Sequence, residues 1–572
     1  MDEFLDGLDL SDPDQVDQVL LKVAELAANE IGRDKVGKVD GLLQTIINLL
    51  SDPEIGKNIK FQCLRVLGNT VADNDYNRNL LLRAHGFEHA MKSCLDDQDT
   101  QIRSTGVIVM FNLCNEFEPA QVVLVSEGFV EILFRILRTD TNNIALTYSR
   151  RVLNLIFTNE SVVDEDLANV AQITGMLETI SDSNVVEYVE LLANLFSIPS
   201  VIKLAVVNDA RPLTLICKAF DLLCDQINDI RIISSISDSH INNSQKRDSE
   251  ISEFQVNDQI SDQIQNDLVQ RMMAVFTQIS ETSQFEDIQH NQSLTTKWRS
   301  WINTSQAPLV NAGLLLLGNL CVTESSSTNM IAQGIHEDLM RIVHSSQSEA
   351  ELYSAGGFLK NLAISEVNKR LLSDKAIEAG QILIQNNSSE IILTGLGLLR
   401  VLTTNYDGNA ELLIEQYPDI LNQAIELYSQ KTDILIKVEI IRLYNALIKS
   451  LCLTIKTEQL INMFKETNIL SKSLLDISID LATEFGNFTD TVVLLSESIL
   501  SLALLSRNEE ARVMTRAQLH RKNKSVSMLT QILDFGDDRL RHNICTLVIL
   551  VGKDADLNSE LALLYNRCIS NI

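Results

Sequence analysis

The sequence is poor in the residues that interrupt helices. Only 7 prolines and 22 glycines occur in 572 residues, while 45% of the chain is apolar. Proteins built from many short strands and tight turns use more proline and glycine, so this composition favours helices. One compact core is also excluded, because single cores stop growing at roughly 250 to 300 residues. We therefore expect an all-α chain that forms either several domains or a solenoid.

Basic residues are scarce as well. The chain has 47 Lys and Arg against 77 Asp and Glu, a formal net charge of -30. A protein that wraps a phosphate backbone needs a basic face, so we expect no nucleic-acid partner and favour a basic protein partner. Residues 1–20 contain seven acids and no Lys or Arg, which is the wrong charge for a secretory or mitochondrial leader.

Long apolar runs, paired cysteines and catalytic motifs are missing. The most apolar stretch, 309–322, is shorter than the roughly 20 residues that cross a bilayer, so we expect no stable membrane insertion. The nine cysteines show no CxxC pairing and are expected to be buried, reduced thiols. No phosphate loop, GxSxG or HExxH motif occurs. We expect a monomer of the cytoplasm, with the nucleus as a second compartment, and no covalent catalysis, cofactor or metal.

One sequence motif recurs eight times along the chain, an apolar helix with a small or polar residue near its centre, and seven of the eight copies end in Asn. Anchors at Asn69, Asn112, Asn154 and Asn194 are 43, 42 and 40 residues apart. A second series lies 42, 39 and 45 residues apart, at Asn319, Asn361, Arg400 and Asn445. These periods match armadillo or HEAT units. A glycine between the polar break and the next apolar helix, as at Gly86, Gly128 and Gly334, suits the sharp corner of an armadillo unit. The fold class expected is an all-α, right-handed superhelical armadillo solenoid.

Four parts are expected from this pattern. They are an acidic N-terminal segment at 1–20, an armadillo array at 21–233, a degenerate repeat with low-complexity loops at 234–306, and a second array at 307–572. The third part is defined by its middle: 234–263 is rich in Ser, Asp, Asn and Gln, a composition that buries little apolar area. Only Leu268–Ile279 is expected to be helical there.

The repeated asparagines allow two interpretations. Arg65, Asn69 and Asp73 lie four residues apart, so stacked repeats would place one Asn per unit along a groove. An amide donates and accepts hydrogen bonds, and there it can hold a partner's backbone. Equally, it can bond the neighbouring repeat and fix the stacking. The two tryptophans, Trp298 and Trp301, lie outside this series, which argues against a tryptophan ladder for a nuclear import signal.

An acidic stretch without Lys or Arg extends from Val152 to Ile202. It attracts a polybasic tail if its carboxylates gather on one surface, and otherwise it is an ordinary solvated face. The candidate residues for binding such a tail are Glu160, Asp164, Glu165, Asp166, Glu187 and Glu190.

Three consecutive sequence segments resemble a known family. Leu314–Leu320 with Asn329–Ile335, then Phe358–Ile364 with Val367–Lys369, then Gly395–Leu402 are similar to adjoining repeats of SmgGDS, an armadillo family that regulates prenylated small GTPases, and of its fungal Rho-binding relatives. The N-terminal array shows a looser similarity, including Leu67–Thr70.

The resemblance implies a partner and candidate residues. In that family, asparagines at the positions of Asn319 and Asn361 grip the GTPase, and we extend this expectation to the anchors Asn69, Asn112 and Arg400. It also implies weak guanine-nucleotide exchange, chaperoning of the prenylated GTPase, and an acidic surface for its polybasic tail. The alternative is an armadillo adaptor that binds an extended peptide of another protein without nucleotide exchange.

Overall fold

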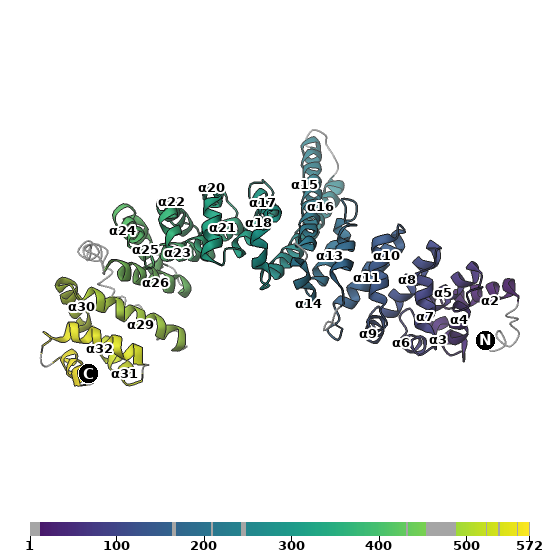
Figure 1. The fold of residues 1–572 in the computed structure, drawn as a ribbon, viewed down its shortest axis with the longest axis horizontal. Coiled ribbons are helices and arrows are strands. Elements are labelled where there is room, and N and C mark those ends of the chain that lie inside the picture. The colour runs from purple at the N-terminus through teal and green to yellow at the C-terminus, as the bar shows by residue number, and fades with distance from the viewer. Residues whose placement is uncertain are drawn as a thin grey trace. The chain divides into compact units, whose positions relative to one another are not determined.

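The computed structural model describes residues 12–162, 167–207, 210–241, 248–430, 433–452, 488–521, 523–535, 538–556 and 559–570. In these ranges the regular structure is helical and no strand occurs, so the all-α prediction is confirmed. The chain forms two compact units, 1–295 and 296–572, which we describe separately. Figure 1 shows the helices of each unit in chain order.

The first unit is built from triplets of helices. A triplet has a short first helix, a second helix and a longer third helix, and the third helices carry the Asn anchors. The bounds are α2 Pro13–Leu26; α3 Glu30–Gly37, α4 Leu42–Leu50 and α5 Lys57–Val71; α6 Asp75–Leu82, α7 Phe87–Leu95 and α8 Thr100–Cys114; α9 Glu118–Ser126, α10 Phe129–Thr139 and α11 Asn143–Phe157; α12 Val170–Leu177 and α13 Val185–Leu195; α14 Pro199–Ile202, η1 Lys203–Val206, α15 Arg211–Ile241, α16 Asp248–Ser280 and η2 Phe285–His290.

Glycine makes the corner between the first and second helices. Gly86 (φ 83°), Gly128 (φ 75°) and Gly334 (φ 79°) adopt the left-handed conformation, and Gly41 (φ 70°) does the same in the first complete triplet. A residue with a Cβ is strained there, which explains why glycine recurs at this point of the repeat. The corner predicted from the sequence is confirmed.

Successive third helices pack side by side within the first unit, in the order α2, α5, α8, α11, α13 and α16. The second helices α10, α12 and α15 form a parallel series. Helices α15 and α16 therefore take the places of the second and third helices in a final repeat, although they have 31 and 33 residues. Stacking buries one face of each helix against its neighbours, as expected for a solenoid.

The second unit repeats the same arrangement. Its third helices α18, α21, α23, α26, α29 and α32 pack in sequence order. Its bounds are α17 Gln292–Trp301, which begins just before the division; α18 Ala307–Asn319; α19 Glu324–Ala332, α20 Ile335–Ser345 and α21 Glu349–Leu362; α22 Glu366–Ile384 and α23 Ser389–Thr403; α24 Asp407–Gln416, α25 Pro418–Gln430 and α26 Ile434–Leu451; α29 Phe488–Leu505; α30 Glu509–Arg521, α31 Asn523–Phe535 and α32 Asp538–Gly552; and α33 Glu560–Ser570.

Two expected segment boundaries differ from the structure. The loops expected at 234–263 lie largely within α15 and α16, where Ile260, Ile264 and Leu268 recur at four-residue spacing despite the polar composition. The expected segment 234–306 also crosses the division between the units at Thr295.

The first described helix begins earlier than the expected start of the armadillo array at residue 21. Helix α2 begins at Pro13, inside the acidic segment expected at 1–20. The Asp12 side chain caps α2 by accepting hydrogen bonds from the N–H groups of Asp14 and Gln15. An acid suits a helix N-terminus because the helix dipole is positive there.

Most cysteines fit the expectation of buried thiols from the sequence. All nine cysteines lie within the described ranges as free thiols, and seven are buried. No single described helix is long and apolar enough to cross a membrane, although α13 with α14 and η1 reaches that length across a bend of 109°. Trp298 and Trp301 of α17 are fully buried, so neither indole is available to a partner.

Candidate protein-binding faces

The third helices give each unit one candidate face. We define the α5–α13 face as the solvent-facing side of α5, α8, α11 and α13, and the α18–α26 face as that of α18, α21, α23 and α26. Asn69, Asn112 and Asn194 are half-buried on the first face, and Asn319, Asn361 and Arg400 are half-buried on the second. Side chains at such positions touch the helices beneath them and still reach a partner.

Hydrogen bonds show what the asparagines of the α5–α13 face do. The Nδ2 of Asn69 donates to the backbone oxygen of Ala24 at 2.9 Å, and the Nδ2 of Asn112 donates to that of Gly68 at 3.0 Å. Each bond joins a third helix to the one before it. The amide N–H therefore fixes the stacking, while neither Oδ1 accepts a hydrogen bond from a described residue. The two interpretations of these asparagines are compatible, since different atoms serve them.

The register of the buried residues identifies which positions are equivalent. Val66, Leu67 and Val71 of α5 match buried residues exactly 43 positions later in α8 and 86 positions later in α11. On this register Leu155, not Asn154, is equivalent to Asn69 and Asn112. Asn154 lies one position earlier, and its Oδ1 accepts a hydrogen bond from the Nδ2 of Asn194 at 3.2 Å.

On the α18–α26 face, Asn361 keeps the stacking bond in a weaker form. Its Nδ2 donates to the backbone oxygen of Gly318 at 3.4 Å, and its Oδ1 accepts no hydrogen bond from a described residue. Asn319 lies at the equivalent position of α18, because Leu316, Leu317 and Leu320 match the buried Phe358, Leu359 and Leu362. The sequence therefore aligned these two residues correctly.

Arg400 is not their equivalent. The buried Phe358, Leu359 and Leu362 match Leu398, Leu399 and Leu402, which places Val401 at the Asn361 position and Arg400 at that of Lys360. The Nε of Arg400 donates to the Glu439 carboxylate on α26, so its charge is already paired. Spacing alone missed this one-residue shift, because the repeat is shorter here than the one before it.

Two neighbouring glycines shape the α18–α26 face. A Cβ at Gly357 meets no atom within 4 Å, so the surface of α21 is open there. A Cβ at Gly356, one residue earlier, lies 2.7 Å from both Leu383 Cδ1 and Thr394 Cγ2. Gly356 therefore serves packing, whereas Gly357 exposes backbone to a partner. Tyr353, four residues before Gly357, is 52% exposed on the same helix.

The acidic stretch is only partly described. Asp164, Glu165 and Asp166 lie outside the described residues. Glu160 is exposed in the turn after α11, and Glu187 and Glu190 are exposed on α13. The Glu187 carboxylate pairs with Arg150. The pKa of Arg271 on α16 is raised chiefly by its hydrogen bond with Asp267, and the charge of Glu190 adds to that rise. Both acids of α13 thus face a cation of the chain itself.

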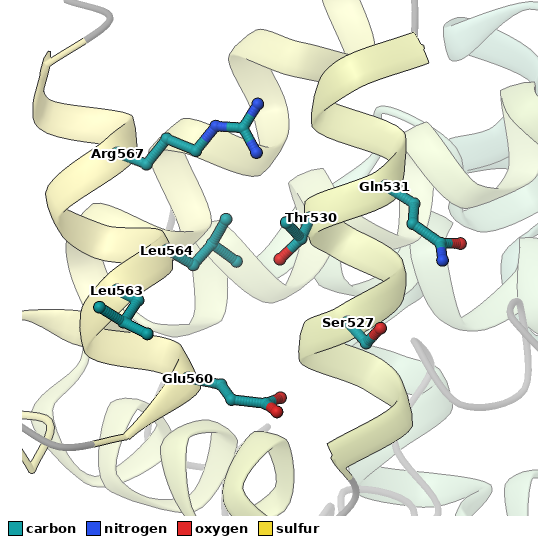
Figure 2. A pocket seen from close by; sticks show the side chains of 7 residues that line it. All are labelled: Ser527, Thr530, Gln531, Glu560, Leu563, Leu564 and Arg567. Atoms are coloured by element: carbon teal, nitrogen blue, oxygen red, sulfur yellow. The ribbon is translucent and has the colours of Figure 1, made fainter.

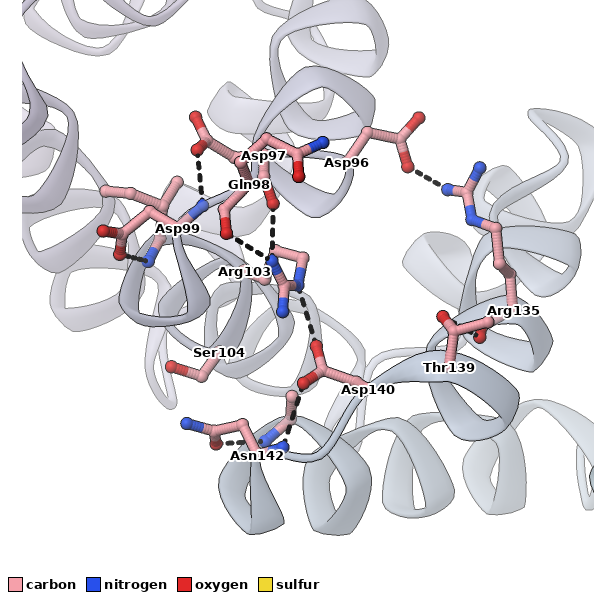
Figure 3. Close-up of polar contacts among 12 residues, drawn as sticks. Asp96, Asp97, Gln98, Asp99, Arg103, Ser104, Arg135, Thr139, Asp140 and Asn142 are labelled. Atoms are coloured by element: carbon pink, nitrogen blue, oxygen red, sulfur yellow. Dashed lines mark hydrogen bonds and ion pairs between the residues drawn. The ribbon is translucent and has the colours of Figure 1, made fainter. Parts of the chain in front are cut away.

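Cations near the α5–α13 face divide into paired and unpaired ones. Arg103 is paired: its Nε donates to Asp140 Oδ2 at 2.8 Å, and its Nη1 donates to the backbone oxygens of Asp97 and Gln98 at 2.7 and 3.0 Å (Figure 3). Lys57, Lys60 and Arg150 also have acidic partners. Arg65 and Arg151 form no ion pair with a described residue.

A second row of amides was missed in the sequence. Asn77, Gln121, Asn368 and Asn409 are buried in the first helices of their repeats. Each donates to a carbonyl near the end of the preceding third helix, at 2.8 to 3.2 Å. They satisfy carbonyls that a helix end leaves unpaired. In the sequence, an Asn or Gln lies seven to nine residues after the anchor of each of these repeats, and this spacing could have revealed the second row.

The described residues also form a pocket between α31 and α33, of about 350 Å³ (Figure 2). Its lining is mixed, with Glu560 and Arg567 at opposite ends of the labelled part of α33. Ser527, Thr530 and Gln531 of α31 and Leu563 and Leu564 of α33 complete the lining.

Chemistry at the described residues is limited. No group of three or more His, Cys, Asp or Glu side chains lies together as a metal site within the described ranges. Burial raises the pKa of the Cys94 and Cys114 thiols to about 12, so these groups stay protonated and weakly nucleophilic at neutral pH.

Comparisons with known proteins bear on the fold. No family model and no curated protein matches the sequence. A solved structure from a study of the phosphorylation switch that controls the interaction between cadherin and beta-catenin matches 93% of this chain and 100% of its own, with a TM-score of 0.52 and 13% sequence identity. An engineered protein matches 90% of this chain and 99% of its own, with a TM-score of 0.45 and 12% identity. The first match supports an all-helical repeat solenoid.

Proposed function

We propose that the α18–α26 face binds a Rho- or Ras-type small GTPase, and that the protein chaperones it or promotes release of its GDP. The observation that supports binding is the row formed by Asn319 and Asn361 beside the open backbone at Gly357. The resemblance of the segments between Leu314 and Leu402 to SmgGDS repeats suggests the partner.

Hydrogen bonding explains how such a row would hold a folded partner. The Oδ1 of Asn361 is available to accept from a backbone N–H of the GTPase. Gly357 lets a loop approach the α21 backbone closely. If these contacts favour the nucleotide-free GTPase over the GDP-bound form, binding shifts the GTPase toward nucleotide release. Exchange then needs no covalent chemistry from this chain.

The polybasic tail of the GTPase would add a second contact. We propose Glu160 as its first acidic contact among the described residues, with Glu190, Asp164, Glu165 and Asp166 as further candidates. Glu187 contributes less, because Arg150 already neutralises it. Surface charge contacts are screened over about 8 Å at physiological ionic strength. Raised salt should therefore weaken binding of the polybasic tail more than binding of the GTPase to the α18–α26 face.

The test measures capture and nucleotide release together. Prenylated and unprenylated Rho-family GTPases loaded with labelled GDP are mixed with the full chain or with the Asn319→Ala/Asn361→Ala variant. The matched control is Asn154→Ala/Asn194→Ala, which removes a bond between two third helices of the other unit at positions outside the candidate GTPase-binding residues. We expect the first pair to lose GTPase capture while its thermal unfolding stays close to that of the control.

Three outcomes separate the alternatives. Loss of capture in the first pair alone supports the proposal. Equal loss in both pairs indicates that the asparagines act through stacking of the solenoid. Absence of capture of any GTPase by the unmodified chain favours the adaptor that binds an extended peptide.

A further inference from the structure

The two unpaired arginines of the α5–α13 face stack on aromatic rings of the same face. The Arg65 guanidinium lies 5.8 Å from the Phe61 ring centre. The Arg151 guanidinium lies 5.3 Å from the Tyr148 ring centre and 5.8 Å from that of Phe111. Phe111 and Tyr148 themselves meet edge to face, with ring centres 5.2 Å apart. Such stacking orients a guanidinium without neutralising its charge.

These arginines differ from the other cations of the same helices. Lys57, Lys60, Arg103 and Arg150 each face a carboxylate, but Arg65 donates only to the neutral Gln62 side chain, at 3.0 Å. In a chain with a net charge of -30, two cations without acidic partners on one face are unexpected. They place two unpaired positive charges, on α5 and α11, between the acids of α13 and helix α2.

We propose that the α5–α13 face binds an extended acidic peptide segment of a partner protein. Arg65 and Arg151 each take a carboxylate. Ile108, which lies at the equivalent position of α8 between them, takes an apolar side chain. The Oδ1 atoms of Asn69 and Asn112 accept from the peptide backbone, since their Nδ2 atoms are used for stacking. This surface is separate from the α18–α26 face.

The geometry fixes the spacing of the acids. Arg65 and Arg151 belong to third helices two repeats apart, and packed helices lie roughly 8 to 10 Å apart, so the arginines are about 16 to 20 Å apart. An extended chain advances about 3.3 Å per residue, which corresponds to five or six residues. Side chains alternate in direction along an extended peptide, so six residues place both acids on the same side.

Nucleic acid is a poorer match for this face. The guanidinium groups already lie over the protein's own rings, which leaves them less free to stack on bases. The negative net charge also opposes binding of a phosphate backbone. A basic peptide would be repelled by Arg65 and Arg151.

The test uses fluorescence anisotropy with the full chain and a labelled twelve-residue peptide. The peptide carries two Asp six residues apart, with Leu two and four residues after the first Asp so that all four side chains point the same way. Companions carry the Asp pair two, four or nine residues apart, or Asn in place of both Asp. The key variant is Arg65→Gln/Arg151→Gln. The control is Arg135→Gln, which removes an arginine of α10 that is already paired with Asp96.

We expect the six-residue spacing to bind best, and the double variant to weaken that binding at least tenfold while the control changes it less than twofold. Equal affinity in the double variant, or no preference for Asp over Asn, would overturn the proposal. Tighter binding of a single-stranded RNA oligonucleotide of similar length would overturn it in favour of nucleic acid. Self-association of the chain that the double variant abolishes would show that a second copy occupies the face.

Discussion

Arg103 on α8 and Asp140, which precedes α11, form a 2.8 Å hydrogen-bonded ion pair across the junction of two repeats (Figure 3). The Asp140 side chain is only 2% exposed, so it depends on Arg103 for its charge balance. Removing one partner of a buried pair leaves an uncompensated charge, at a cost of roughly 3 to 5 kcal/mol. Arg103→Ala should therefore destabilise the first unit by about 3 kcal/mol, measured by chemical denaturation.

Arg135→Ala provides the comparison for Arg103. Arg135 pairs with Asp96 at the same junction, but both side chains are nearly half exposed. Exposed pairs contribute about 0 to 1 kcal/mol. A loss of stability in Arg135→Ala equal to that in Arg103→Ala would show that burial of the pair is not what matters.

The pH dependence of the pair has a defined sign. Burial alone raises the pKa of Asp140, but hydrogen bonds from Arg103 and from the Asn142 N–H outweigh it, so the pKa of Asp140 is lowered. A lowered pKa in the folded state gives stability that is present above the unfolded value of about 3.9 and is lost as pH falls through the folded value. The stability difference between the unmodified chain and Asp140→Asn should be constant from pH 8 to pH 5 and shrink below about pH 4. A difference that shrinks between pH 8 and pH 6 would contradict this assignment.

The two rows of asparagines should respond differently to mutation. Asn368 is fully buried and donates to Leu362 O at 2.9 Å and to Ser327 Oγ at 3.0 Å. Asn368→Leu leaves that carbonyl without a partner and should cost about 1 to 3 kcal/mol. Asn361→Ala removes only a 3.4 Å bond at a half-buried site and should cost less than about 1 kcal/mol. Thermal unfolding of both variants checks the ranking, and the reverse order would show that Asn361 is chiefly structural.

The fold could be predicted from the sequence because the same residue pattern occurs in several repeats. A corner such as Gly86 needs a positive φ, and glycine meets that need at nearly the same point of several repeats. The equivalence of Asn319 and Asn361 could be read for the same reason. The Asn154 and Arg400 positions could not. Asn154 lies one position before the equivalent Leu155 although the register of buried residues is unchanged there, and the repeat that leads to Arg400 is shorter than the one before it.

The ion pairs could not be predicted from the sequence. Arg150 and Glu187 are 37 residues apart, and nothing local predicts that they pair. The same holds for Arg65 and Arg151, whose lack of acidic partners depends on which side chains each repeat places beside them. Composition suggested an acidic protein, whereas packing decides which cations remain unpaired.

Ser373 is expected to be a site where glycine stabilises the fold. It interrupts α22 with φ 29° and ψ -121°, at the corner where other repeats have glycine. Sparsely populated backbone conformations of this kind cost about 1 to 3 kcal/mol for a residue with a Cβ. Ser373→Gly should therefore raise the melting temperature of the second unit. Ser388→Gly, which replaces the serine that precedes α23 at φ -75° and makes no side-chain cap hydrogen bond, serves as the control and should not. A lower melting temperature for Ser373→Gly would show that its side chain contributes more than its backbone costs.

Gly356 and Gly357 allow the proposed GTPase face to be blocked without damage to the fold. A Cβ at Gly357 meets open space, so Gly357→Ala should gain about 1 kcal/mol from helix propensity and Gly357→Trp should still fold. The indole would project from the α18–α26 face and obstruct a partner there, so GTPase capture by Gly357→Trp should fall at least tenfold.

Gly356→Ala should instead destabilise the unit, because its Cβ would lie 2.7 Å from Leu383 and Thr394. Circular dichroism melting measures the stabilities and a pull-down with prenylated GTPase measures capture. Full capture by a folded Gly357→Trp protein would mean that the partner binds elsewhere, because no folded GTPase could pack against α21 with an indole standing between them.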